Sequence, residues 1–206
     1  KYNVTIWNSV PALLDMLLLA HEEKTEKRLP LRAVMISGDW INLGLPARLE
    51  RAAEGCRFVA MGGATEASIW SNYCEVKLPL PSFWNSIPYG APLKNQVYRV
   101  VDDLGRDRPD WVKGELYIGG AGVAAGYRGD EKLTSEKFTC ENGMRFYHTG
   151  DMGRFWSDGT IEFLGRKDHQ VKVCGHRIEL GEVESALEKL GSVDKAAVTV
   201  VGDERH

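Results

Sequence analysis

Three short segments combine glycine with polar side chains in a way that could bind a nucleotide. In "FYHTGDMGRFW" (146–156), Thr149-Gly150-Asp151 separates two aromatic, strand-like runs. An aspartate on an open turn can accept hydrogen bonds from both hydroxyls of a ribose. Asp and Gly also dominate turns that bind nothing, through their backbone chemistry alone. The segment by itself leaves both interpretations open.

The second segment is "GGATEASIW" (62–70). Gly62, Gly63 and Ala64 let the backbone approach a ligand closely. Thr65 offers a hydroxyl, and Glu66 offers a carboxylate of the kind that holds magnesium beside phosphates. The alternative is an ordinary helix start, with Thr65 as N-cap and Glu66 complementing the helix dipole.

The third segment, "GRKDHQVKV" (165–173), contains Arg166, Lys167 and Asp168. Arginine is a permanently charged fork donor, which suits a diol or a phosphate oxygen. Taken alone, however, this segment favours a charged linker between two domains.

A further glycine-rich segment, "GGAGVAAG" (119–126), fits the pattern G-x-G-x-x-A. Such a turn holds a dinucleotide phosphate when a helix follows it. Here the following "YRGDEKLTSEKF" is polar and is interrupted by Gly129. We therefore favour a glycine-lined loop packed against a neighbouring strand over a nicotinamide site.

The composition excludes several classes of protein. Of 206 residues, 43% are hydrophobic and 27% charged, as in soluble globular proteins, and the net charge of −3 disfavours a nucleic-acid partner. The apolar run Pro11–Ala20 contains Asp15 and is too short to span a membrane. With no signal peptide and no zinc-ligand spacing, we interpret the four distant cysteines as free thiols in a cytoplasmic protein: Cys56, Cys74, Cys140 and Cys174.

The elements that must position these residues change in type along the chain. Residues 1–77 alternate strand and helix, with helices from Pro11 and over Leu45–Ala53, which predicts a βαβαβ unit with a parallel sheet. Ligands bind beyond the carboxyl ends of such strands, where the turns at 37–39 and 62–66 lie. From residue 78 to 167, short alternating strands predict an antiparallel, barrel-like layer.

Two details of the later elements concern the candidate site. Ser157-Asp158-Gly159 is typical of a hairpin turn, so we expect Asp151 to lie in a turn just before a rigid hairpin. Residues 168–206 predict a second hairpin, the amphipathic helix "GEVESALEKLG" and the strand "AAVTVV". These elements are too few to bury a core. We therefore place a domain boundary at Asp168, and both chain ends look like cuts through a larger protein.

Taken in order, "GGATEASIW", "GELYIGGAGVAAGY", "YHTGDMGRF" and "GRKDHQVKVCGHRIELGEVE" resemble four successive core motifs of the adenylation domains of nonribosomal peptide synthetases. These domains belong to the adenylate-forming enzymes, with acyl-CoA ligases and luciferase. The resemblance covers nearly the whole chain. It implies the C-terminal part of a large α/β core with a β-barrel-like layer, followed by the start of a small α+β subdomain.

The resemblance also implies roles for individual residues. Asp151 would bind the ribose hydroxyls of ATP together with Arg166, and Glu66 would coordinate Mg²⁺ at the triphosphate. Gly63, Ala64 and Thr65 would line the nucleotide, with Thr65 contacting a phosphate during catalysis. Two positions depart from the family pattern: Gly62 replaces an aromatic residue that stacks on adenine, and Ala64 replaces a proline. Phe163 could supply one stacking face, and Asp168 matches the interdomain hinge.

Six positions match the selectivity residues of the family and resemble the pattern of cysteine-activating domains that build thiazoline or thiazole rings: Asn8, Met35, Ser37, Met61, Ile69 and Trp70. An apolar, polarizable pocket with two small polar groups suits a compact thiol side chain. The alternative is that Met35, Met61 and Ile69 are simply core residues.

The implied reaction has two steps. An amino-acid carboxylate attacks ATP to give an aminoacyl adenylate, and the phosphopantetheine thiol of a carrier-protein domain then takes the aminoacyl group. A condensation or cyclization domain is the expected neighbour. The phosphate loop and the catalytic lysine of the family are not in these 206 residues, so we expect the isolated piece to be inactive. The rival functions are an acyl-CoA or aryl-acid ligase, a non-catalytic interaction module and, last, a nicotinamide oxidoreductase.

Overall fold

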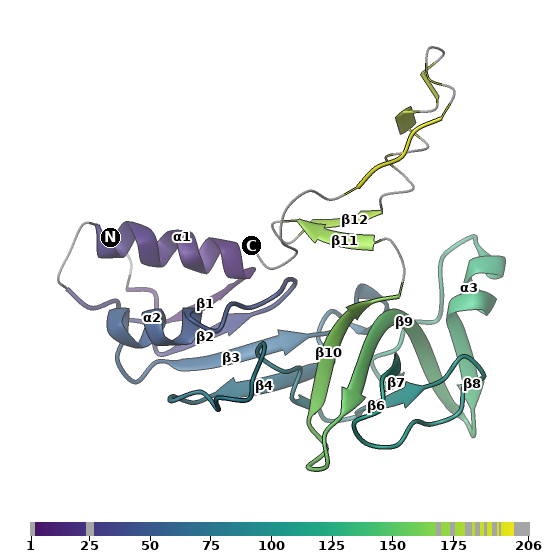
Figure 1. The fold of residues 1–206 in the computed structure, drawn as a ribbon, viewed down its shortest axis with the longest axis horizontal. Helices are drawn as coiled ribbons and strands as arrows, with labels where there is room; N and C mark the ends of the chain where they lie inside the picture. The colour runs from purple at the N-terminus through teal and green to yellow at the C-terminus, as the bar shows by residue number, and fades with distance from the viewer. Residues whose placement is uncertain are drawn as a thin grey trace.

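The architecture was analysed in a computed structural model. It describes residues 3–23, 27–167, 170–173 and 176–179, together with 183, 186, 187, 189, 190, 193 and 195–199. Two five-stranded sheets follow one another along the chain, and a two-stranded sheet comes after them (Figure 1).

The first sheet confirms the predicted βαβαβ unit. Its strands are β1 (Ile6–Ser9), β2 (Ala33–Ile36), β3 (Arg57–Gly62), β4 (Asn72–Val76) and β5 (Ala91–Pro92), in that spatial order. The first three strands are parallel, and β4 and β5 are antiparallel additions. The parallel order places the carboxyl ends of β2 and β3 at the same edge, where the predicted ligand turns begin.

Two helices cover one face of this sheet (Figure 1). They are α1 (Pro11–Glu22) and α2 (Leu45–Ala52), and each has a proline in its first turn, where the missing N–H costs nothing. Leu14 and Leu18 of α1 and Leu49 of α2 are almost fully buried against the core-facing side chains of β2 and β3. The helices therefore leave the opposite face of the sheet for other contacts.

The second sheet is antiparallel, as predicted, but it is not a closed barrel. It has the order β10 (Ile161–Arg166), β9 (Met144–Phe155), β7 (Gly114–Gly120), β6 (Gln96–Val101), and β8 (Phe138–Glu141) also pairs with β9. Asp130 is the N-cap of the short helix α3 (Glu131–Lys137), and its carboxylate accepts a hydrogen bond from the Leu133 N–H. Within the described residues no ladder joins β10 to β6, so the sheet stays open.

The predicted turn at Asp151 is wrong, because β9 runs without interruption through Thr149, Gly150 and Asp151. The register with β7 slips between Glu115 and Tyr117, and Gly150 has a φ of +73°. A glycine in this conformation helps β9 carry three residues, 149–151, opposite the single residue Leu116 of β7, which makes a β-bulge. The predicted Ser157–Gly159 hairpin is confirmed, since β9 and β10 pair on either side of it.

The glycine-rich segment at 119–126 packs as expected for a structural loop. A Cβ at Gly120 would lie 2.3 Å from the Asn95 carbonyl oxygen, and one at Gly126 would lie 2.4 Å from the Thr134 methyl carbon. Within the segment 119–126, only Gly119 and Gly120 belong to β7. No helix follows this segment until Glu131. The geometry therefore lacks the helix that a nicotinamide-binding turn requires.

Near the C-terminus, the predicted hairpin is confirmed as β11 (Gln170–Val173) and β12 (His176–Glu179). Val183, Ala186 and Leu187 are helical, whereas Lys189 and Leu190 form a turn and a bend; the other positions of the predicted helix lie outside the described residues. Of the expected strand "AAVTVV" (196–201), the described residues 196–199 form no strand, and Val200 and Val201 lie outside the described part of the chain. Alternating apolar residues do not make a strand unless a neighbour shares its ladder.

Two other predictions can be compared with the described part of the chain. Cys56, Cys74 and Cys140 are free thiols, and Cys174 lies outside that part. Among the described helices, none has the length and apolar character needed to cross a membrane.

Candidate functional site

The structure brings Asp151 and Arg166 together. They are register partners on β9 and β10, and Arg166 Nη1 lies 2.7 Å from Asp151 Oδ1. Their side chains are only 12% and 13% exposed. The bulge fixes this position, because the Thr149 hydroxyl accepts the Asp151 N–H at 2.9 Å and donates to the Leu116 carbonyl at 2.6 Å. The result is a mostly buried, charge-compensated carboxylate at a defined place.

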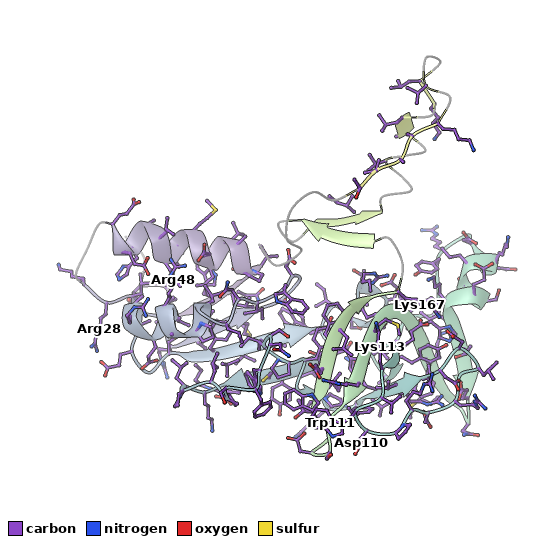
Figure 2. The ribbon with its side chains drawn as sticks, viewed as in Figure 1. Arg28, Arg48, Asp110, Trp111, Lys113 and Lys167 are labelled. Carbon is purple, nitrogen blue, oxygen red and sulfur yellow. The ribbon has the colours of Figure 1, made fainter. Side chains whose placement is uncertain are left out.

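The bulge is tied to the end of β10. The Gly150 N–H donates to Glu115 Oε1 at 3.2 Å, and the Lys167 N–H donates to the Gly150 carbonyl at 2.8 Å. Lys167 Nζ lies 2.7 Å from Asp103 Oδ1, and this hydrogen bond raises the pKa of Lys167. Figure 2 shows Lys167 at one end of the second sheet and Trp111 at the other. Asp168, the predicted hinge, lies outside the described residues.

Aromatic rings surround Phe163, the predicted stacking residue. Its ring is parallel to that of Tyr89, with centroids 5.0 Å apart and planes 8° apart. Trp40 meets Phe163 at a tilt of 55°, with centroids 5.8 Å apart. Trp40 follows β2 and Tyr89 precedes β5, so three distant segments meet here. Sequence analysis missed Tyr89 and Trp40, because both lie in loops without a motif of their own.

Glu66 lies in the three-residue 3₁₀ turn Thr65–Ala67, not in an α-helix. The N-cap residue is Ala64, and no side chain caps the turn, so the alternative that Thr65 is a helix N-cap is wrong. Glu66 is 9% exposed and accepts a hydrogen bond of 2.8 Å from the Tyr127 hydroxyl. Burial, and next the Glu66 charge, raise the pKa of Tyr147. Thr65 is exposed beside this buried carboxylate.

Gly63 serves the loop's own packing. It has a φ of +145°, and a Cβ there would lie 2.7 Å from Ser71 N and 2.8 Å from Ile69 O. Ala64 packs against the core of the second sheet, in the same cluster as Ala67. The loop from 62 to 71 thus joins the end of β3 to the second sheet, with Glu66 between them.

The six predicted substrate residues gather around the open face and the carboxyl edge of the first sheet. Asn8 and Met35 are register partners, and Met61 lies two residues beyond Val59, the partner of Met35 on β3. All three therefore face the side that the helices leave uncovered. Asn8 Nδ2 donates to the Met35 carbonyl at 3.1 Å.

The other polar contact of this group joins two loops, where Trp70 Nε1 donates to Ser37 Oγ at 3.0 Å. Ile69 is 61% exposed with a φ of +71°. Met35 and Met61 are half-buried and belong to neither buried core cluster. The alternative that Met35, Met61 and Ile69 are ordinary core residues is therefore wrong.

Few side chains near Glu66 could bind a metal ion together with it. In the part of the chain that the structure describes, no three His, Cys, Asp or Glu side chains gather in a way that could hold a metal ion. Glu66 is thus a single carboxylate. This fits Mg²⁺, which proteins bind through one or two carboxylates together with substrate phosphates and water.

Comparisons with known proteins show what this arrangement is similar to. The profile of a family described as "AMP-binding enzyme" matches residues 1–128. The chain is 56% identical over 205 residues to the anguibactin system regulator of Vibrio anguillarum, covering 98% of this chain and 19% of that protein. It is 55% identical over 203 residues to pyochelin synthetase PchE of Pseudomonas aeruginosa, covering 98% of this chain and 14% of that protein.

A solved structure agrees with these sequence matches. The crystal structure of the nonribosomal peptide synthetase FmoA3 in its α-methyl-L-serine-AMP-bound form superposes with a TM-score of 0.76 at 44% identity. That match covers 88% of this chain and 20% of FmoA3. The chain therefore spans about a fifth or less of the length of these three proteins.

Proposed function

Because the chain belongs to the family of AMP-binding enzymes, we propose that it is part of an amino-acid-activating adenylation domain of a nonribosomal peptide synthetase. The complete domain forms an aminoacyl-AMP from ATP and an amino acid. It then loads the aminoacyl group as a thioester on the phosphopantetheine of a carrier-protein domain. The observation that carries the proposal is the buried Asp151–Arg166 pair beside the Tyr89–Phe163 stack.

Asp151 binds the ribose hydroxyls of ATP in this proposal. The Arg166 guanidinium compensates the cost of burying the carboxylate, so Asp151 stays ionised and accepts hydrogen bonds from the diol. Phe163 lies three residues before Arg166 on β10 and supplies an aromatic face for the base. Ribose and base are adjacent in a nucleotide, which matches the adjacency of these groups.

Glu66 holds Mg²⁺ at the triphosphate, with Tyr127 orienting its carboxylate through the 2.8 Å hydrogen bond. When bound, the ion neutralises phosphate charge. The exposed Thr65 hydroxyl is available to contact a phosphate oxygen. These residues position reactants and compensate charge, which is the main contribution of proteins at phosphoryl centres.

The amino acid lies against the open face formed by Asn8, Met35 and Met61, next to the Ser37–Trp70 hydrogen bond. Two thioethers make a polarizable wall that suits the thiol of cysteine, which we propose as the substrate. Serine is the second candidate. It is favoured by the 44% identity to a synthetase structure that holds α-methyl-L-serine-AMP.

The proposed domain organisation assigns residues 1–167 to the C-terminal part of the adenylation core and 168–206 to the start of a small subdomain. Asp168 is the hinge between them. The partners are the carrier domain and a neighbouring condensation or cyclization domain of a cytoplasmic synthetase. This organisation is supported by the matches to longer proteins, which cover 88–98% of this chain but about a fifth or less of each relative.

The test uses the intact synthetase and measures pyrophosphate exchange that depends on the added acid. We expect cysteine to give the highest kcat/KM, serine a lower one, and phenylalanine and aspartate almost none. Exchange driven by an aryl or fatty acid instead would favour the rival ligase. A preference for an aromatic or acidic amino acid would reject the cysteine assignment, and a synthetase that binds no ATP through this domain would identify a non-catalytic module.

A further inference from the structure

The loop between β3 and β4 turns sharply just before Trp70. Ser68 and Ile69 both have left-handed backbone conformations, with φ values of +61° and +71°. This region is unfavourable for residues other than glycine, and most of all for a β-branched side chain such as that of isoleucine. Such a conformation persists only where the surrounding structure holds it in place. The contacts of residues 68–70 therefore matter for the shape of this loop.

Two side-chain hydrogen bonds join this turn to the second sheet and its loops. Gln96, the first residue of β6, donates from Nε2 to the Trp70 carbonyl at 2.8 Å. The Ser68 hydroxyl donates to the Gly122 carbonyl at 2.8 Å. In the other direction, the Trp70 indole donates from Nε1 to Ser37 Oγ at 3.0 Å, just beyond the end of β2. Trp70 is thus held from the second sheet by its carbonyl and from the first sheet by its indole.

The Gln96 amide has little room to move. A Cβ added at Gly122 would lie 2.9 Å from Gln96 Nε2 and 3.1 Å from Gln96 Cδ, so the amide packs directly against the Gly122 backbone. Gln96 Oε1 is buried and has no hydrogen-bond partner within the part of the chain that the structure describes. A buried acceptor without a donor costs stability. The amide therefore stabilises the fold less than a fully paired one would, while its N–H group fixes the position of Trp70.

We propose that Gln96 is a positioning residue of the amino-acid site, which keeps Trp70 against Ser37 through its hydrogen bond to the Trp70 carbonyl. This inference rests on the proposed function, since it requires that Trp70 and Ser37 border the bound amino acid. Gln96 lies outside the motifs that the sequence indicated. A side chain whose place is fixed in advance needs no ordering when the ligand binds, so less free energy is lost.

The test measures pyrophosphate exchange by the intact synthetase and determines the KM for cysteine and the KM for ATP separately. Gln96→Met keeps the length of the side chain but removes the donor. We expect the KM for cysteine to rise by about three- to tenfold, as for one lost neutral hydrogen bond. The KM for ATP and kcat should stay within about twofold, because the Asp151–Arg166 pair is retained. Equal changes in both KM values, or an unchanged KM for cysteine, would overturn the proposal.

A double variant shows whether Gln96 acts through Trp70. In a Trp70→Phe background, which lacks the hydrogen bond to Ser37, Gln96→Met should raise the KM for cysteine by less than about twofold. Residues that serve one shared contact do not contribute independently. If the two single effects multiply in the double variant, Gln96 acts independently of the Trp70–Ser37 contact and the proposal is wrong.

Two further variants test the placement of the amide. Gly122→Ala retains Gln96 but takes the space of its amide, and it should raise the KM for cysteine as Gln96→Met does. Thr139→Val is the control, because it removes a polar group of the same sheet that contacts His148 at 3.1 Å, and both KM values should stay within about twofold. An unchanged KM for cysteine in Gly122→Ala, or an equal rise in Thr139→Val, would count against the proposal.

The single variant Trp70→Phe separates this inference from the proposed function. If Trp70→Phe raises the KM for cysteine and Gln96→Met does not, only the role of Gln96 is wrong. If Trp70→Phe also leaves this KM unchanged, the assignment of the amino-acid site is itself wrong.

Discussion

The guanidinium of Arg166 lies 2.7 Å from the carboxylate of Asp151, and the two residues occupy one register position of β9 and β10. Both side chains are mostly buried, so neither charge can rely on water for compensation. Removing one partner should therefore cost more free energy than breaking an exposed ion pair, because it leaves the other charge buried and uncompensated.

Replacing Asp151 by Asn in the intact synthetase should lower kcat/KM for ATP by at least about tenfold. The amide keeps the shape of the side chain but removes the charge that Arg166 compensates, a loss of about 1.5–3 kcal/mol. The control is Asp158→Asn at the exposed hairpin, where activity should stay within about twofold. Unchanged kinetic constants in Asp151→Asn would show that Asp151 does not take part in ATP binding.

Replacing Glu66 by Gln should reduce kcat by about a hundredfold and raise the Mg²⁺ concentration needed for half-maximal exchange, because a neutral amide is a poor ligand for a hard cation. Tyr127→Phe removes the 2.8 Å hydrogen bond to that carboxylate but leaves the carboxylate in place, so it should cost far less. The measurement is pyrophosphate exchange over a Mg²⁺ titration. A Glu66→Gln enzyme with the wild-type Mg²⁺ dependence would contradict the metal assignment.

Trp70→Phe should raise the KM for the amino acid while the KM for ATP stays close to the wild-type value. The change retains an aromatic ring but removes the hydrogen bond that holds Ser37 at 3.0 Å, so the loops after β2 and β3 lose a contact. We expect a three- to tenfold effect, as for about 1 kcal/mol of a neutral hydrogen bond. Equal increases in both KM values would indicate a general loss of structure.

Gly120→Ala should destabilise the adenylation domain by about 1–3 kcal/mol more than Gly129→Ala. Both glycines have positive φ, at +109° and +77°, but only at Gly120 would the added carbon meet another group, the Asn95 carbonyl oxygen at 2.3 Å. The readout is the rate of limited proteolysis of the intact synthetase. Equal rates for the two variants would mean that the Gly120 contact can relax.

Cys74 should react slowly with iodoacetamide at pH 8. Burial raises the pKa of its thiol to about 11 from 9.0, so its thiolate fraction is about a hundredfold below that of an ordinary cysteine. Its alkylation rate should keep rising with pH up to about 11. Mass spectrometry of the native synthetase would compare it with the exposed Cys140, and denaturation should remove the difference.

Much of the first sheet could be predicted because its signals are local. The apolar spacing of α2 and the alternation of β3 depend on residues three or two apart, and Asp158-Gly159 specifies its own hairpin. The chemistry of Asp151, Glu66 and Arg166 made them candidates, and the resemblance of the surrounding motifs gave each a predicted role. Their secondary structure was less certain, since the same glycine that permits a turn at 150 permits a bulge inside a strand.

The pairings that make the site needed the folded chain. Asp151 meets Arg166 because a bulge and a hairpin set the register of two strands, and a shift of one residue would turn either side chain to the other face. Tyr89 stacks on Phe163 and fills the space beside Gly62, although Gly62 lies 27 positions earlier in the sequence.

Alternation likewise divided the first sheet into two faces, but only the packing of α1 and α2 decided that Met35 and Met61 lie on the uncovered one. Local backbone chemistry thus determined the elements and the reactive groups. Contacts between distant segments, which no short pattern encodes, decided how those groups face one another.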